Sequence, residues 1–465
     1  MPATRLRIVK GSCWPCKKRR VKCDLSKPAC RRCASTGATC DYNSRLIRWS
    51  TRQSTHVPPA FGSISRSDVH LTASLDVCER RALDYFHRRV WPLLSASKEP
   101  CAAPTPVALE HRVVLLAACV LSDSHRRLQD GAFSGNNGGL SERRLECLAA
   151  VRTEIAGCCV DVQGTGPLVV LLFAVILLHF DDGYVGCTLK TASTSSHYSG
   201  VLAILQRLGG IHSVLKTAPE PLHMLISEFV TTDLTTSIIR GRPPFFQPEV
   251  WDAIDQGPVW WGRDPLGRVS LASVFREMAS MSLYLEATTS MTQDFSIERV
   301  RRFEAALRPV YAPLTMGDCD CQSTSSEASD GPSATEMEAV HAFTLIRAFQ
   351  HAALLYLYRA ICGLPTRHAL VQQHVKSCLA CIFEVPRQAK VLNCVIFPLF
   401  LAGVHSVSAE EQTAIMKMAD FLFDDMRFAS IEAVRSVFKE IWCSTRADLS
   451  WFEVFKHLSP HALVL

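Results

Sequence analysis

Apolar residues recur at intervals of three and four positions over most of the chain, from about residue 69 to the end. This spacing places apolar side chains along one face of an α-helix, and the pattern repeats from helix to helix. The sequence shows no strand-rich region and no solenoid repeat, so it predicts a large all-helical domain over residues 69–465. The first clear apolar stripe consists of Ala82, Leu83, Phe86, Val90 and Leu93.

Glycines, prolines and polar clusters predict where individual helices begin and end. Gly166-Pro167 is expected to start a very apolar helix that reaches Phe180, and Asp181-Asp182-Gly183 is expected to stop it. Gly209-Gly210 is expected to cap a helix over residues 196–208. The other predicted helices cover residues 107–121, a segment that starts at residue 141, and residues 221–239, 270–286, 296–307, 353–360, 370–383, 391–404, 415–428 and 431–442.

The two longest apolar runs bear on the question of a membrane span. They cover residues 168–180 and 391–404, and both fall short of the about 20 residues that cross a bilayer. The chain opens without a signal peptide, and most of the cysteines after residue 42 lie in apolar runs, as buried thiols of a reducing compartment do. The sequence therefore predicts a soluble, intracellular protein with no membrane partner.

Two segments lack the apolar periodicity. Residues 43–68 are rich in Ser, Thr and Arg and contain two adjacent prolines, which predicts a flexible linker. Residues 317–336 are rich in Asp, Ser, Glu and Thr, which predicts a disordered surface loop. The linker separates the helical domain from a small cysteine-rich module over residues 13–42, and a basic arm over residues 1–12 precedes that module.

The cysteine-rich module contains two copies of one unit, a close cysteine pair followed by a third cysteine seven residues later. Thiolates suit Zn²⁺, and a Cys-x-x-Cys pair can direct two sulfurs at one metal ion. Two tetrahedral zinc ions need eight sulfur contacts, and six thiolates supply eight if two of them bridge. The symmetry of the repeat suggests Cys13 and Cys30 as the bridges. The predicted ligands are Cys13, Cys16, Cys23, Cys30, Cys33 and Cys40.

Positive charge is concentrated in the same part of the chain. Residues 1–60 carry 14 Lys and Arg against 2 Asp and Glu, although the whole chain has a net charge of only +6. Five of the six residues between Cys16 and Cys23 are cationic good helix formers, which predicts a short basic helix held by the metal. Six thiolates and two Zn²⁺ leave the cluster itself negative, so a polyanion outside the module explains these cations.

Three alternatives compete with this interpretation. Six cysteines can form a disulfide framework, but no secretory signal precedes them. Two separate metal sites of another type are also open, although no histidine occurs in residues 1–55. The basic run can serve as a nuclear-import signal, a use that can coexist with polyanion binding.

The segment from Cys13 to Cys40 resembles the fungal Zn2Cys6 binuclear-cluster transcription factors. All six cysteines agree with that family's pattern, as do the basic run, Cys23-Asp24 and the Lys27-Pro28-Ala29-Cys30 loop. The resemblance implies that the first and fourth cysteines bridge two Zn²⁺ ions. It also implies a nuclear protein that binds double-stranded DNA at a CGG-type triplet.

The same resemblance assigns roles to the basic residues. The position just before the hydrophobic residue of the first helix reads base edges in that family, and here it falls on Arg20. The family more often has Lys there; Arg keeps the charge and can bind guanine O6 and N7 with a two-pronged contact. The remaining cations would mainly hold phosphates. They are Lys17, Lys18, Arg19 and Lys22.

Residues 70–460 resemble, less specifically, the fungal-specific transcription factor domain in its second type. The shared features are an apolar helix, an acidic stop, a polar loop and a helix ending in Leu208-Gly209-Gly210. The resemblance implies a helical regulatory region that senses a metabolite or contacts coregulators. Many members follow the cluster with a dimerising coiled coil, but this linker holds no apolar heptad, so a homodimer and a monomer both stay open.

These patterns predict a zinc-dependent, sequence-specific DNA-binding transcription factor of RNA polymerase II genes, which controls a metabolic or secondary-metabolite gene set. The alternative is a zinc-cluster interaction protein that regulates transcription through a protein or RNA partner. No enzyme activity is predicted, because the common metalloprotease, hydrolase, phosphate-loop and dinucleotide signatures are missing from the sequence. His179 lies beside Asp181-Asp182, and we expect it to satisfy carbonyls at the end of its helix.

Overall fold

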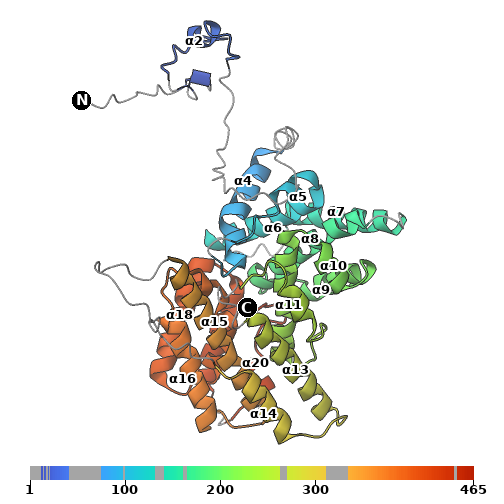
Figure 1. Cartoon of the computed structure of the whole chain (residues 1–465), viewed down its shortest axis with the longest axis vertical. Helices are drawn as coiled ribbons and strands as arrows, with labels where there is room; N and C mark the ends of the chain where they lie inside the picture. The colour runs from blue at the N-terminus through green and yellow to red at the C-terminus, as the bar shows by residue number, and fades with distance from the viewer. Residues whose placement is uncertain are drawn as a thin grey trace, which may run out of the picture. The chain divides into compact units, whose positions relative to one another are not determined.

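The computed structural model of the chain describes residues 12–13, 15–16, 19, 21–40, 75–97, 100–130, 141–160, 165–261, 270–309, 334–444 and 448–465. Within these ranges every regular element is a helix, which confirms the predicted mostly-α fold (Figure 1). Contacts divide the chain into two units, Met1–Ser63 and Ile64–Leu465. The predicted linker lies outside the described residues, and so does the predicted loop up to residue 333.

The N-terminal helices of the larger unit pack around α6. A reciprocal pair of hydrogen bonds caps α4: the Glu79 N–H donates to Asp76 Oδ1 at 2.7 Å, and the Asp76 N–H donates to Glu79 Oε2 at 3.1 Å. The predicted stripe from Ala82 to Leu93 is buried, which confirms its assignment to the core. These elements are α4 (Val77–Tyr85), η1 (Phe86–Val90), η2 (Trp91–Leu94), α5 (Thr105–Glu110), α6 (Arg112–Gln129) and α7 (Glu142–Val160).

The single helix predicted over residues 107–121 is wrong, because two helices meet there. His111 has an extended backbone (φ −126°, ψ 110°) between α5 and α6. Its carbonyl accepts hydrogen bonds from the N–H groups of Val114 and Leu115, both at 3.1 Å, so a new helix starts after it. Apolar periodicity runs through the break, and for that reason it does not reveal the boundary.

The apolar helix α8 (Gly166–Phe180) starts at Gly166-Pro167 as predicted, but Asp181-Asp182-Gly183 does not stop it. A π-helical turn, η4 (Asp181–Val185), continues the helix to Gly186. The two aspartates remain in the helix because both carboxylates pair with the buried Arg144 of α7 instead of turning to solvent.

This continuation corrects the expected length of the apolar segment. Gly166–Val185 is a 20-residue helix that is long and apolar enough to cross a membrane, and 89% of its most apolar window is buried inside the protein. It packs against α6, α7, α9 and α11. The core helix of a globular protein can be equally long and apolar, and the burial of this helix is typical of such a core helix.

The middle of the larger unit holds the next set of helices. Gly209 and Gly210 have left-handed φ angles of +86° and +91°, and the Gly210 N–H donates to the Leu205 carbonyl at 2.8 Å, which confirms the predicted cap. These elements are α9 (Thr194–Arg207), α10 (Ile211–Thr217), α11 (Glu220–Arg240), α12 (Val250–Ile254), α13 (Leu271–Thr289) and α14 (Ile297–Ala306).

The C-terminal helices complete the unit, and Figure 1 shows α14 and α16 at its far end from α4 and α7. The single helix predicted over residues 391–404 is wrong, since Val395 separates a short 3-10 turn from α17. Pro398 is the third residue of α17, where its missing N–H costs no helical hydrogen bond. These elements are α15 (Ala334–Tyr356), η5 (Leu357–Ile361), α16 (Ala369–Glu384), η6 (Lys390–Cys394), α17 (Ile396–Val404), α18 (Ala409–Met426), α19 (Ala429–Cys443) and α20 (Trp451–Phe455).

A small cavity lies where η2, η4, α11, η6 and the C-terminal residues meet, and Glu228 of α11 lines it. The Glu228 side chain is buried, and its Oε2 has no hydrogen-bond partner among the described residues. Burial raises the pKa of this carboxyl to about 8. Glu228 is therefore mainly neutral at pH 7 in the folded protein and ionised in the unfolded chain.

This difference makes the folded state less stable as the pH rises. From the ordinary glutamate pKa to about 8, each pH unit is expected to lower the free energy of unfolding by about 1.4 kcal/mol through Glu228 alone. Glu228→Gln mimics the neutral acid, so its stability relative to the parent should increase from pH 5 to pH 8. Urea unfolding at three pH values measures this difference. Glu249→Gln, at an exposed position, is the control, and a constant parent-to-Glu228→Gln difference across the range would contradict the assignment.

Candidate metal centre

The second half of the cysteine-rich module is organised by the four-residue helix α2 (Arg31–Ala34). Cys30 is the N-cap residue, and its Sγ accepts a hydrogen bond from the Cys33 N–H at 3.3 Å. The Arg31 N–H donates one hydrogen bond that both oxygens of the Asp24 carboxylate share, at 3.1 Å to Oδ1 and 3.2 Å to Oδ2. The carboxylate also accepts a hydrogen bond from the Ser26 hydroxyl, and this bond holds the pKa of Asp24 below its usual range. The carboxylate therefore ties the inter-cysteine loop to the start of α2.

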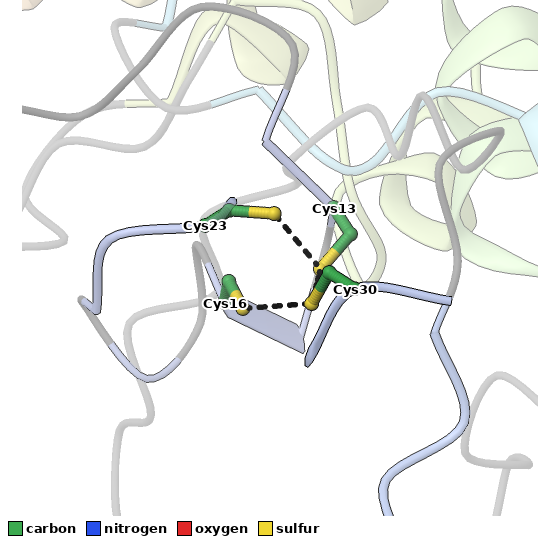
Figure 2. A group of neighbouring side chains, drawn as sticks. All are labelled: Cys13, Cys16, Cys23 and Cys30. Atoms are coloured by element: carbon green, nitrogen blue, oxygen red, sulfur yellow. Dashed lines mark hydrogen bonds between the residues drawn. The ribbon is translucent and has the colours of Figure 1, made fainter. Parts of the chain in front are cut away.

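The six cysteine sulfurs form two overlapping sets of four, and within each set all sulfurs lie within 4.8 Å of one another. Figure 2 shows the first set converging on one point. Cys13 and Cys30 belong to both sets, and they are the pair that the sequence symmetry selects. The first set is Cys13, Cys16, Cys23 and Cys30, and the second is Cys13, Cys30, Cys33 and Cys40.

The sulfur spacing fits tetrahedral zinc. The Sγ atoms of Cys13 and Cys30 are 3.6 Å apart, those of Cys16 and Cys30 are 3.6 Å apart, and those of Cys13 and Cys23 are 3.8 Å apart. Zinc–sulfur bonds of about 2.3 Å at tetrahedral angles separate two sulfurs by roughly 3.8 Å. The donor set and its geometry therefore suit a thiolate-bound zinc cluster.

The pKa values of the cysteine thiols also bear on metal binding. Burial raises the pKa of Cys13, and it raises the pKa of Cys16 to about 12. The Cys40 pKa is lowered instead, mainly because its sulfur accepts a hydrogen bond from the Cys30 N–H at 3.2 Å. Zinc ligands must be thiolates, so the buried thiols need a compensating metal cation before they all ionise.

The predicted DNA-binding residues differ in whether the structure describes them and in whether their side chains have partners. Lys17, Lys18 and Arg20 lie outside the described residues. Lys22 is exposed on the chain that leads to Cys23. Arg19 is also exposed, but its guanidinium is hydrogen-bonded inside the module.

Only part of the predicted basic helix falls within the described residues. The Arg19 N–H donates to the Pro15 carbonyl at 3.1 Å, as in an α-helical turn. The Val21 N–H donates to the Cys16 carbonyl at 3.0 Å, and Val21 itself is not helical. The helical turn that starts at Pro15 has therefore ended by residue 21.

Two known protein families match the chain. Residues 11–50 match the fungal Zn(2)-Cys(6) binuclear cluster domain, and residues 81–464 match the fungal specific transcription factor domain. The chain belongs to the fungal specific transcription factor family. Both matches are to domains of transcription factors, which indicates that this family member is a regulator of transcription.

One curated relative of this transcription factor family member is named for a biosynthetic pathway. Over 162 residues the chain is 26% identical to the aspercryptin biosynthesis cluster-specific transcription regulator of Emericella nidulans. The match covers 29% of this chain and 27% of that protein, so the chain spans about a quarter of its relative. No solved structure matches the chain.

His179 in the transcription factor domain is not part of a metal site among the described residues. Its Nδ1 lies 3.2 Å from the Thr194 carbonyl oxygen, and its ring packs against the rings of both Tyr198 and Phe229. Burial lowers its pKa to about 4, so the ring is neutral at pH 7. A histidine bound to a carbonyl was expected, but this carbonyl begins α9 and does not end the histidine's own helix.

Sequence reasoning missed the structural roles of three polar residues of the module. Asp24 caps the inter-cysteine loop, while Thr36 and Arg19 join the two halves of the module. Asp24 was noted only as part of the family resemblance, and no spacing rule links it to Arg31. Each of these roles depends on a partner brought close by the fold, so the sequence carries no local signal for it.

Proposed function

We propose that this protein is a zinc-dependent, sequence-specific DNA-binding transcription factor that acts in the nucleus on RNA polymerase II genes. The observation that carries the proposal is the presence of Cys13 and Cys30 in both four-sulfur sets, which lets six thiolates hold two zinc ions. Membership in the transcription factor family supports the same function.

Zinc, when bound, supplies positive charge and tetrahedral geometry to a module too small for an apolar core. The chain supplies the rest: the cysteines fix the ends of the basic segment, and the Asp24 carboxylate holds the start of α2. Arg20 would read a guanine of a CGG-type triplet through O6 and N7 in the major groove. Lys17, Lys18 and Lys22 would bind phosphates and so set the register on the duplex.

The role of the curated relative supports a proposal about the kind of genes that this chain controls. That relative is a cluster-specific regulator of aspercryptin biosynthesis, so we propose that this chain controls a biosynthetic gene set. The helical domain would contact coregulators or an effector. Because the linker sequence lacks an apolar heptad, a homodimer would form through the helical domain and not through a coiled coil.

Two substitutions separate base reading from phosphate binding. Arg20→Ala is expected to weaken binding to the preferred duplex by about 1–3 kcal/mol while leaving non-specific binding nearly intact. Lys17→Ala should weaken binding to all duplexes and lower the slope of log affinity against log salt by about one. Fluorescence anisotropy with a preferred and a scrambled duplex over a range of salt concentrations measures both effects.

The pair of substitutions is also its own control, because each removes one cation from the same segment. If Arg20→Ala kept the parent's preference for one duplex over the other, Arg20 would not be the base-reading residue. A zinc-loaded parent protein with no duplex preference would favour the alternative, a regulator that acts through a protein or RNA partner.

A further inference from the structure

The guanidinium of Arg19 uses all three of its nitrogens inside the module. Nη1 donates to Thr36 Oγ1 at 2.7 Å, Nη2 donates to Cys33 Sγ at 3.5 Å, and Nε donates to the Pro15 carbonyl at 3.3 Å. Pro15 belongs to the first half of the module, whereas Cys33 and Thr36 belong to the second half. Arg19 therefore connects the two halves.

We propose that Arg19 is a positioning residue of the zinc cluster that clamps the two halves of the module together through its hydrogen bonds to Pro15, Cys33 and Thr36, and that it is not a phosphate contact. This role rests on the proposed function, because it assumes a zinc cluster in the module. It assigns to Arg19 a task different from that of the other four cations in the basic run.

The charge of the cluster gives a reason for a cation at this position. Six thiolates around two Zn²⁺ carry a net negative charge, and an N–H donor to a ligating sulfur lowers the charge that the sulfur must hold. Cys33 is fully buried, and the Arg19 Nη2 donor reaches its sulfur at 3.5 Å.

The geometry also explains why this residue is an arginine. One planar guanidinium reaches the Thr36 hydroxyl, the Cys33 sulfur and the Pro15 carbonyl at the same time. The ammonium group of a lysine is a single point and cannot span these three acceptors. Lysine at this position would keep the charge and lose the clamp.

Lys22 provides the contrast. It is exposed, and it makes no hydrogen bond or ion pair with another residue in the described part of the module. Its charge is therefore available to a polyanion, whereas the guanidinium of Arg19 is already engaged. The two residues lie in the same basic run, so each is a matched control for the other.

The test uses the full-length, zinc-loaded protein and two readouts, the rate of zinc release to an excess chromogenic chelator and the salt slope of duplex binding. Arg19→Ala is expected to release zinc about 10-fold to 100-fold faster, the usual effect of losing a partner of a metal ligand, with the parent's salt slope. Arg19→Lys should also release zinc faster. Thr36→Val, which keeps the cation, should change zinc release in the same direction by a smaller factor.

Lys22→Ala should do the opposite, with a salt slope lowered by about one and the parent's rate of zinc release. A salt slope lowered by about one in Arg19→Ala, or an unchanged rate of zinc release in Arg19→Ala and Thr36→Val, would overturn the proposal. If Arg19→Ala holds no zinc at all, the rates of zinc release from Arg19→Lys and Thr36→Val test the proposal in its place. A parent protein that holds no zinc would instead contradict the proposed function.

Discussion

Cys30→Ser is expected to remove both zinc ions from the full-length protein and to abolish duplex binding. Cys30 belongs to both four-sulfur sets, so its loss takes a ligand from each metal position at once. Serine is itself a good N-cap residue, so the start of α2 keeps its cap and the substitution mainly tests the sulfur. Structural zinc contributes about 10–16 kcal/mol to the folding of small zinc modules, which makes this the largest effect that we expect.

Two other cysteines supply the comparison for this substitution. Cys40 belongs to one set only, so Cys40→Ser should keep more zinc than Cys30→Ser. Cys443 is exposed in the helical domain, and Cys443→Ser should retain all of the zinc. Zinc per chain is measured by elemental analysis after gel filtration. A Cys30→Ser protein that keeps one zinc per chain would show that Cys30 is not shared between two metals.

Arg144→Met is expected to destabilise the helical domain by about 3–5 kcal/mol, the usual effect of removing one partner from a buried ion pair. The Arg144 side chain is 10% exposed and pairs with Asp181 and with Asp182, the latter through Nη2 and Oδ1 at 2.6 Å. Asp182 keeps two other donors, His197 Nε2 at 3.2 Å and the Ser193 N–H at 2.9 Å. Asp181 keeps only the neutral Ser124 hydroxyl as a hydrogen-bond partner, and its Oδ1 lacks a partner among the described residues.

Methionine nearly matches the length of the arginine stem, so the substitution leaves the packing of α7 largely intact while removing the charge. Burial already raises the pKa of Asp181 to about 6, and the loss of Arg144 should raise this pKa further. The destabilisation should therefore be larger at pH 7.5 than at pH 5, where Asp181 can be protonated in the folded state.

The matched control is Arg302→Ala, which breaks a pair with Glu298 at 2.8 Å in which both side chains are more than 60% exposed. Exposed pairs of this kind contribute about 0.5 kcal/mol or less. Guanidinium unfolding followed by circular dichroism at 222 nm compares the two variants. Equal losses in Arg144→Met and Arg302→Ala would mean that the buried network does not stabilise the fold.

The periodicity of apolar residues was sufficient to predict the helical domain, but three boundaries needed information from distant parts of the chain. Asp181-Asp182 looks like a helix stop in the sequence, and only its pairing with Arg144, 37 residues earlier, keeps it helical. The breaks at His111 and Val395 interrupt continuous apolar patterns. The helix α20 has five residues, too few for periodicity to show, and the Trp451 indole N–H holds it to the Ile238 carbonyl at 3.0 Å.

In the candidate metal centre, the ligands could be predicted from the sequence, whereas the different roles of the cations could not. Spacing and symmetry were enough to propose six ligands with Cys13 and Cys30 shared, because stoichiometry is a property of the sequence. The cations of the basic run look equivalent in the sequence, and the fold distinguishes them by bringing Thr36 and Cys33 to Arg19. These contacts join positions 17 and 14 residues apart, beyond the reach of any helical or turn rule.

Selection from a pool of random DNA duplexes by the zinc-loaded, full-length protein tests the central claim most directly. We expect enrichment of a CGG-type triplet, and we expect chelation of zinc or Cys30→Ser to abolish that enrichment. A protein that holds two zinc ions per chain and enriches no sequence would contradict DNA reading by this module.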